Sequence, residues 1–216
     1  MTSRLMDAAG WTGEARPFST SIAVAGLTIF CLLATTSTVR AENTRCVSAL
    51  GNQIVLGDLV VPDGASCALR DATVRGSVLV GPHAGLRVLG NVRILGDVRI
   101  DRCDYASFEP PAAAGPIFVE GNVEIEHCEG STGKLYTAGT VRISGNFTCH
   151  DNTAPCFAVA LSIYGDALVS GNSGGISFIE GSRIIGKLEC AGNLGVSNYG
   201  DPNRVAGKKL GQCAGL

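Results

Sequence analysis

Three side chains able to bind cations or transfer protons recur at one position of a repeated motif. Asp101, Glu126 and His150 each lie five residues after a motif glycine. If the motifs stack, they form a column that could act as general acid and base on a glycan or bind calcium. A solvated polar edge is the simpler interpretation, because glycosidase carboxylates flank a cleft and calcium prefers more oxygen ligands. Arg99 and Glu124, three residues after their glycines, are expected to form a stacked ion pair.

Aromatic side chains lie in the two longest intervals between the motifs. Tyr105 and Phe108 belong to the segment 104–116, and Tyr136 belongs to the segment 129–139. Binding groups concentrate on loops that a rigid scaffold carries, and exposed rings can stack on sugar faces. These rings are therefore candidate glycan-binding residues. The alternative is that they only cover the flank of the fold.

The motif reads apolar, any, Gly, any, apolar, any, apolar, and its glycines recur every 19 to 25 residues. Alternation with a period of two predicts a strand with one buried face. A residue that tolerates tight turns usually follows the glycine, as Asp58, Asp97 and Asn122 do. The seven main copies are 55–61, 74–80, 94–100, 119–125, 143–149, 163–169 and 184–190.

Equivalent positions of the copies hold similar residues. The position two residues before the glycine is β-branched in all seven copies. Such columns arise when each coil of a solenoid lies on the previous one. A second strand per coil is visible early in the chain, where 65–69 matches 84–88. The sequence predicts an all-β fold, a single-stranded parallel β-helix (β-solenoid) with about seven or eight coils of ~21 residues.

Eight of the nine cysteines lie beyond residue 41. An even number in an exported chain indicates a disulfide framework, and the absence of a Cys-x-x-Cys pair argues against a cysteine zinc site. Three of the expected disulfides join residues about one coil apart, and the fourth closes a lateral loop. The predicted pairs are Cys46–Cys67, Cys103–Cys128, Cys149–Cys156 and Cys190–Cys213.

Residues 1–41 have the features of a signal peptide. Arg4 and Arg16 precede an apolar stretch at 22–34, and small or β-branched residues suit cleavage before Glu42. We therefore expect a signal peptide over 1–41 and a β-solenoid domain over 42–216, in a bacterial protein that is secreted, periplasmic or on the cell surface. The stretch is too short to span a bilayer comfortably, so no membrane span is expected after signal removal. An uncleaved N-terminal anchor is the alternative.

The composition excludes several classes of protein. The 216 residues are 45% hydrophobic, 17% charged and 6% aromatic, with a formal net charge of −2. These values argue against a disordered tail, a multi-span membrane protein and a basic nucleic-acid-binding domain. Neither a nucleophile elbow nor a phosphate-binding loop nor a zinc-helix signature occurs. We therefore expect no cofactor, no metal and no nucleic-acid partner.

Four segments combine the repeat with further glycines and cysteines: GDLVVPDGASCALRDATVRGSVLV (57–80), GNVRILGDVRIDRC (90–103), IIGKLECAGN (184–193) and PNRVAGKKLGQC (202–213). They resemble a group of secreted bacterial proteins with glycine- and valine-rich repeats. The resemblance implies the solenoid fold and export but no catalytic residues, because that group has no established activity. More distantly, the coils are similar to bactofilins, cytoskeletal β-helices that polymerise end to end. Bactofilins are cytoplasmic and lack this cysteine framework.

A nearly complete stacking pattern without a convincing catalytic constellation predicts a non-enzymatic structural or surface-interaction protein. Its partner would be an extracellular or cell-wall glycan or an envelope protein. The alternative is a polysaccharide lyase or glycoside hydrolase of the β-helix type. In that case Asp101, Glu126 and His150 would carry the chemistry.

Overall fold

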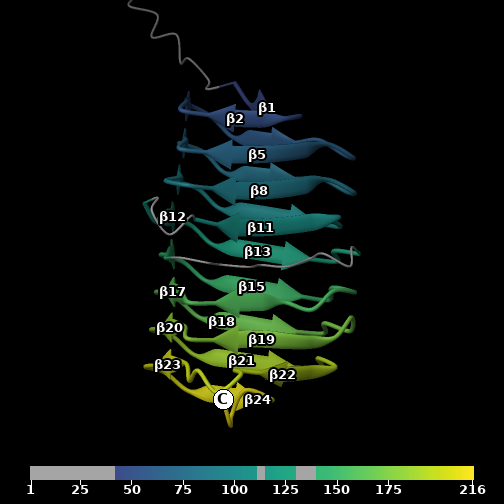
Figure 1. Cartoon of the computed structure of the whole chain (residues 1–216), viewed down its shortest axis with the longest axis vertical. Helices are drawn as coiled ribbons and strands as arrows, with labels where there is room; N and C mark the ends of the chain where they lie inside the picture. The colour runs from purple at the N-terminus through teal and green to yellow at the C-terminus, as the bar shows by residue number, and fades with distance from the viewer. Residues whose placement is uncertain (1–41, 111–114, 130–139) are drawn as a thin grey trace, which may run out of the picture. The chain divides into compact units, whose positions relative to one another are not determined.

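The computed structural model describes residues 42–110, 115–129 and 140–216. These residues belong to the second of the two units into which the chain divides, Val39–Leu216. The expected signal peptide, residues 1–41, and the candidate residue Tyr136 lie outside the described residues. Figure 1 shows the described part as coils that follow one another along one axis in chain order. Across these residues we find no helix with the length and apolar character needed to cross a membrane.

A complete coil contributes one strand to each of three faces, and the strands within each sheet run parallel. In the described residues, the first face is a nine-stranded sheet of β1 (Thr44–Arg45), β4 (Leu59–Val61), β7 (Val78–Val80), β10 (Val98–Asp101), β13 (Val123–Glu126), β15 (Phe147–His150), β18 (Ala167–Ser170), β21 (Leu188–Ala191) and β24 (Lys209–Gly211).

The second face is an eight-stranded sheet in the described part of the chain. It consists of β3 (Ile54–Val55), β6 (Thr73–Val74), β9 (Arg93–Ile94), β12 (Ile117–Val119), β14 (Val141–Ile143), β17 (Leu161–Ile163), β20 (Arg183–Ile184) and β23 (Arg204–Val205). The third face carries a four-stranded sheet of β2 (Ala49–Gly51), β5 (Ser66–Arg70), β8 (Gly85–Leu89) and β11 (Tyr105–Glu109), and a three-stranded sheet of β16 (Phe157–Val159), β19 (Ile176–Glu180) and β22 (Gly195–Ser197).

The predicted inward columns pair in register between coils. In the nine-stranded sheet Val98 lies between Val78 and Val123, and in the eight-stranded sheet Val119 pairs with Ile94. The side chains at the three inward positions of all seven motifs are at most 5% exposed. The all-β solenoid of about seven turns and the register of its coils are therefore confirmed.

The motif glycine lies against the turn of the preceding coil. A Cβ on Gly121 would meet the Oδ1 atom of Asp97 and the backbone of Gly96. Asp97 Oδ1 accepts the backbone N–H of Asn122 at 2.9 Å, and Asn122 Oδ1 accepts the backbone N–H of Asn146 at 2.9 Å. The turn side chains thus form a hydrogen-bonded ladder from coil to coil. Glycine is required beside it because any side chain would occupy the place of the ladder.

A second ladder lies inside the corner between the nine-stranded sheet and the third face. Asn152, Asn172 and Asn193 are buried there. The Nδ2 group of Asn152 donates to Asn172 Oδ1 at 2.8 Å, and that of Asn172 donates to Asn193 Oδ1 at 2.9 Å. Asn152 Oδ1 in turn accepts the backbone N–H of Cys128 at 2.8 Å. These amides satisfy one another and the backbone, which burial requires.

The structure brings together the same four cysteine pairs that the spacing predicts. Three pairs join residues 21 to 25 positions apart, and one pair joins residues seven positions apart. All Cα–Cα distances fall within the range of disulfides, ~4.4–6.8 Å, and the pairing is compatible with an oxidising environment. The distances are 5.5 Å for Cys46–Cys67, 4.4 Å for Cys103–Cys128, 6.4 Å for Cys149–Cys156 and 5.2 Å for Cys190–Cys213.

The motif glycine gives a first testable prediction. Gly121→Ala should destabilise the fold by about 1–3 kcal/mol, because the new Cβ meets the turn of the preceding coil. Gly215→Ala is the matched control, because nothing lies within 4 Å of its Cβ position, and it should stay within about 0.5 kcal/mol of the parent. Urea unfolding of the oxidised protein, followed by circular dichroism, measures both. Equal midpoints for the two variants would contradict the steric argument.

The buried amide ladder gives a second prediction. Asn172→Ala removes the acceptor of both the backbone N–H and the Nδ2 group of Asn152. Each buried donor left without a partner costs about 1–3 kcal/mol, so the variant should unfold at clearly lower urea concentration. Asn43→Ala, at an exposed position, serves as control. If the two variants are equally stable, the ladder does not contribute as argued.

Candidate functional site

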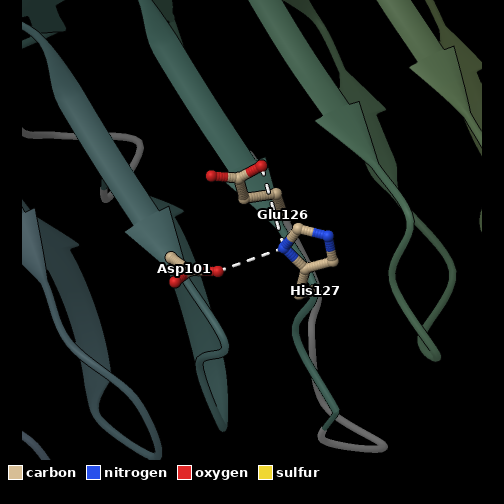
Figure 2. Close-up of side chains that lie close together, drawn as sticks. All are labelled: Asp101, Glu126 and His127. Carbon is tan, nitrogen blue, oxygen red and sulfur yellow. Dashed lines mark hydrogen bonds and ion pairs between the residues drawn. The ribbon is translucent and has the colours of Figure 1, made fainter.

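The structure brings the predicted polar column together at the ends of three neighbouring strands. Asp101 of β10 pairs in register with Glu126 of β13, and Glu126 pairs with His150 of β15. His127, which the motif analysis did not include, joins the column. Its Nδ1 atom lies 3.1 Å from Asp101 Oδ1 and 3.7 Å from Glu126 Oε2 (Figure 2).

The imidazole of His150 is held at both of its nitrogen atoms. Its Nδ1 atom lies 2.9 Å from Asp151 Oδ2, and its Nε2 atom lies 3.3 Å from Glu126 Oε2. The side chain is 21% exposed, which makes it the less exposed of the two histidines here. The carboxylate of Asp151 fixes the ring so that Nε2 faces Glu126. We call this cluster of Asp101, Glu124, Glu126, His127, His150 and Asp151 the polar corner.

The two arginines of this region, Arg99 and Arg102, both bind aspartates. Arg99 and Glu124 are in register, but the predicted ion pair between them is wrong. Arg99 Nη2 instead lies 3.2 Å from Oδ2 of Asp97, which directly precedes strand β10. Arg102 Nε donates to Asp101 Oδ2 at 2.9 Å. Glu124 is therefore left without an arginine or lysine partner among the residues that the structure describes.

The backbone of the polar corner is left-handed at successive coils. Arg102, His127 and Asp151 have φ angles of 52°, 52° and 53°. In the next two coils the equivalent residues are Gly171 and Gly192, both with φ of 65°. Glycine adopts this conformation without steric cost, whereas other residues do so at a cost of roughly 1–2 kcal/mol. The middle coils thus place charged or imidazole side chains where glycine would be less strained, and Asn52 and Asp71 adopt the same conformation in other turns.

Two carboxylates near the corner have a lowered pKa. For Asp97 the backbone N–H of Asn122 is the main cause, and Arg99 adds to it, so its pKa lies below its ordinary value. For Asp101 partial burial raises the pKa, but hydrogen bonds from Arg102 and His127 outweigh it and hold the pKa below the usual range. Both groups therefore keep their negative charge in mild acid.

The aromatic residues do not form the expected lateral platform. Tyr105 and Phe108 lie on β11, where Phe108 pairs with Val88, so this segment is the third strand of its coil. The expectation that Phe108 faces a ligand is wrong, because it is 1% exposed and belongs to the core. The ring of Tyr105 covers Gly85, where a Cβ would meet it. Tyr136 lies outside the described residues.

The outer side of the eight-stranded sheet carries a column of arginines that the motif analysis did not single out. Arg142 pairs with Phe118 on one side and Ser162 on the other, and Arg183 pairs with Arg204. The overlooked signal is an arginine three residues before the glycine, at 93, 142, 183 and 204. All of these arginines are exposed. We call this surface the arginine face, and it consists of Arg75, Arg93, Phe118, Glu120, Arg142, Tyr164, Arg183 and Arg204.

The arginine face combines free positive charge with rings. Arg93 Nε donates to Glu120 Oε1 at 3.0 Å, and the guanidinium of Arg142 lies 5.5 Å from the ring centre of Phe118. Within the described residues, Arg75, Arg183 and Arg204 form no ion pair. A hollow of about 720 Å³ lies on this face, lined by Asp71, Thr73, Asn91, Arg93, Phe118, Glu120 and Ser144.

Comparisons with protein-family models, with curated proteins and with solved structures found no match to this chain. The resemblances to secreted glycine- and valine-rich repeat proteins and to bactofilins therefore stay predictions from the sequence. The function has to be argued from the geometry of the polar corner and the arginine face.

The lowered pKa of Asp97 predicts a loss of stability in acid. Because its folded pKa lies below the unfolded value near 3.8, the carboxylate stabilises the fold above about pH 4 and ceases to as the pH falls through the folded pKa. Asp97→Asn should therefore lower the melting temperature at pH 7 and reduce the further loss between about pH 4 and pH 2. Asp63→Asn, at an exposed position, controls for the loss of one charge. Identical pH profiles for Asp97→Asn and the parent would contradict this assignment.

Proposed function

We propose that the protein is an exported, non-enzymatic β-solenoid that binds an acidic polysaccharide along the arginine face. The observation that carries this proposal is the in-register arginine column of the eight-stranded sheet. Positive charge is gathered there although the chain as a whole has a net charge of −2. Such a local excess attracts a polyanion through charge complementarity.

The spacing of the arginines suits a polymer that runs along the stack. Neighbouring coils are ~4.8 Å apart, so the backbone positions of Arg142 and Arg183, two coils apart, are separated by roughly 9–10 Å. Guanidinium groups bind carboxylates through paired hydrogen bonds. Phe118 and Tyr164 lie between the charges on the same face, where their rings can contact the apolar side of a sugar.

A carboxylated polysaccharide fits this surface better than a nucleic acid. The face presents two rings, Phe118 and Tyr164, among the exposed aliphatic side chains of Leu56, Leu95 and Ile185, so it lacks the succession of rings on which the bases of a single strand stack. The chain is also expected to be exported, and the polyanions available to an exported protein are extracellular polymers. The four disulfides are compatible with such an environment.

The hydrolase or lyase alternative has less support from the polar corner. Carboxylate oxygens of Asp101 and Glu126 lie within 4.8 Å of each other, with His127 equally close. This separation is shorter than the ~6.5–9.5 Å of inverting glycosidases and close to the ~5–5.5 Å of retaining ones, so it argues against an inverting enzyme. The hollow on the arginine face also includes neither Asp101 nor Glu126, whereas glycosidase carboxylates flank the bond to be cleaved.

Replacement of two arginines tests the binding proposal. The double variant Arg142→Gln/Arg183→Gln should bind polygalacturonate or alginate roughly 10-fold more weakly or worse, because charge-assisted contacts are lost. Arg87→Gln is the matched control, since Arg87 is exposed on β8 of the third face, and it should bind like the parent. Isothermal titration calorimetry at two salt concentrations gives the affinities, and higher salt should weaken binding by the parent.

Several outcomes would contradict the proposal. Equal affinity of the double variant and Arg87→Gln, equal affinity for neutral dextran, or preferential binding of duplex DNA would each reject it. The length distribution of the polysaccharide, measured before and after incubation, separates binding from cleavage. Shortened chains would favour the enzyme alternative instead.

A further inference from the structure

Three groups that commonly bind metals converge on the polar corner. One carboxylate oxygen each from Glu124 and Glu126 and a ring nitrogen of His150 lie within 4.8 Å of one another. His150 Nε2 and Glu126 Oε2 are 3.3 Å apart. Zinc bonds of ~2.0–2.2 Å in a tetrahedron place neighbouring ligand atoms about 3.3–3.6 Å apart. The corner therefore already holds this nitrogen and this oxygen at the separation of two zinc ligands.

The surroundings of His150 match those of a metal-binding histidine. Such a histidine usually donates its other ring N–H to a carboxylate, which fixes the tautomer and the ring orientation. Asp151 Oδ2 lies 2.9 Å from Nδ1 of His150, while Nε2 faces Glu126. The ring is thus oriented by one carboxylate and turned toward another.

The charges of the corner leave these carboxylates open to a cation. Arg99 is bound by Asp97 and Arg102 is bound by Asp101. Neither guanidinium therefore neutralises Glu124, which has no basic partner among the described residues. Glu124 and Glu126 lie on the same outward side of β13, where their negative charges repel unless a cation lies between them.

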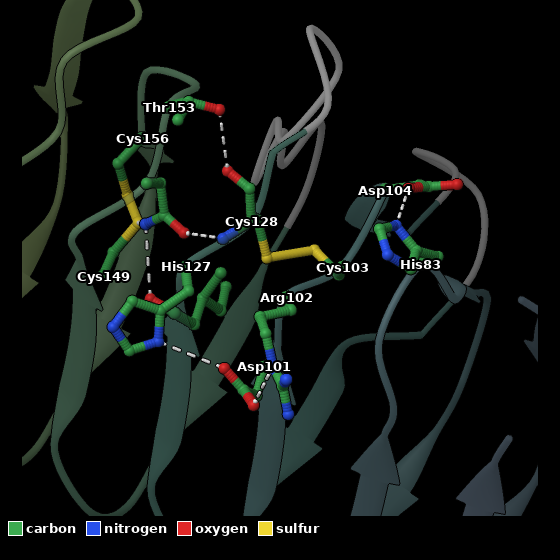
Figure 3. The surroundings of a disulfide bond; sticks show 12 residues. His83, Asp101, Arg102, Cys103, Asp104, His127, Cys128, Cys149, Thr153 and Cys156 are labelled. Atoms are coloured by element: carbon green, nitrogen blue, oxygen red, sulfur yellow. Dashed lines mark hydrogen bonds and ion pairs between the residues drawn. A yellow bond between two sulfur atoms is a disulfide. The ribbon is translucent and has the colours of Figure 1, made fainter. Parts of the chain in front are cut away.

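Disulfides hold the candidate ligands in place. Glu126 lies two residues before Cys128, and His150 follows Cys149 directly. Figure 3 shows His127 and Asp101 beside the Cys103–Cys128 disulfide, with the Cys149–Cys156 disulfide next to it. Ligands on strand ends next to covalent cross-links are preorganised, which favours a defined metal geometry.

We propose that Glu124, Glu126 and His150 bind a first-row transition metal ion such as Zn²⁺, with Asp151 orienting the imidazole. A nitrogen ligand with two carboxylates suits zinc and its neighbours, whereas calcium takes six to eight oxygen ligands. The ion would connect β13 to β15 across the nine-stranded sheet. This site lies on a different sheet from the arginine face, so it goes beyond the proposed polysaccharide binding.

A second group, Asp101, Glu126 and His127, shares Glu126 with the first. Arg102 already forms an ion pair with Asp101, and His127 is 52% exposed. These features make the second group the weaker site. Variants that separate the two groups are therefore part of the test.

The test is a calorimetric titration with Zn²⁺. The protein is first purified in its oxidised form, and any free thiol is alkylated. The parent should bind one ion saturably and prefer Zn²⁺ over Ca²⁺. Asp151→Asn should weaken binding roughly 10–100-fold, the usual effect of losing such an orienting partner. His150→Gln and Glu126→Gln should weaken binding more than Asp151→Asn does.

Two further histidine variants complete the test, and each replaces a left-handed residue by one that tolerates this conformation. His83→Asn is the control and should bind Zn²⁺ like the parent. His127→Asn separates the two groups and should lower the affinity much less than His150→Gln does. Long-range ¹H–¹⁵N spectra should show that Zn²⁺ shifts Nε2 of His150 and leaves the His83 ring unchanged. These spectra use the parent protein and do not depend on the folding of any variant.

The proposal is rejected by any of three results. One is the absence of saturable Zn²⁺ binding by the parent, which would make the His150–Glu126 contact an ion pair only. Another is stronger binding of Ca²⁺ than of Zn²⁺. The third is equal loss of affinity in His83→Asn or His127→Asn and in His150→Gln, because the ligands would then not be those assigned.

Discussion

The contact between each motif glycine and the turn of the preceding coil is the constraint on which the rest of this structure depends. Coils ~4.8 Å apart leave room for the hydrogen bond that the backbone N–H of Asn122 donates to Asp97 but not for a Cβ on Gly121. This contact fixes the height and the register of each coil on the one before. Every residue at a given distance from the glycine then lies beside its counterpart in the next coil. The apolar columns, the amide ladder and the arginine column all follow from this one register.

At the corner beside the nine-stranded sheet, different residues at equivalent positions connect successive coils. The interior corner position holds Cys103 and Cys128, joined by a disulfide, and then Asn152 and Asn172, joined by an amide hydrogen bond. Both solutions close the corner between successive coils, one covalently and one by satisfying buried donors and acceptors. Cys128 links the two, because its backbone N–H donates to Asn152. The corner is therefore continuous although its chemistry changes.

The sequence predicts those features that depend on spacing alone. Alternating apolar residues around a recurrent glycine were enough for the solenoid, its inward columns and the four cysteine pairs. Features that depend on which way a side chain turns were missed. Phe108 occupies the position of Val88 one coil later, so only an extension of the match between 65–69 and 84–88 by one more coil would have marked it as buried. Arg99 forms its ion pair with Asp97 and not with Glu124. Spacing alone does not say which of two neighbouring acids an arginine binds.

The candidate site could be predicted only in part for the same reason. The column of Asp101, Glu126 and His150 follows from register and was predicted. His127 lies one residue beyond the strand, where a left-handed backbone turns its ring back toward Asp101. That reversal cannot be derived from a period-two pattern. The polar amide ladder was missed because Asn152 and Asn172 look like loop residues unless their burial is known.

The polar corner and the arginine face differ in a way that argues for separate roles. A solenoid core constrains the inward positions, whereas its outward positions are free to vary without loss of packing. The arginine face uses this freedom at no structural cost, because its residues lie in ordinary strands. In the polar corner, by contrast, outward side chains come with backbone strain. Arg102, His127 and Asp151 have a left-handed backbone at positions where glycine stands in the coils that follow. Glycine makes the same turn with less strain, since Gly171 continues the same backbone pairing. Other turns are left-handed as well, at Asn52, Asp71 and His83. It is therefore the different charge of the two surfaces, and not this conformation, that argues for separate roles.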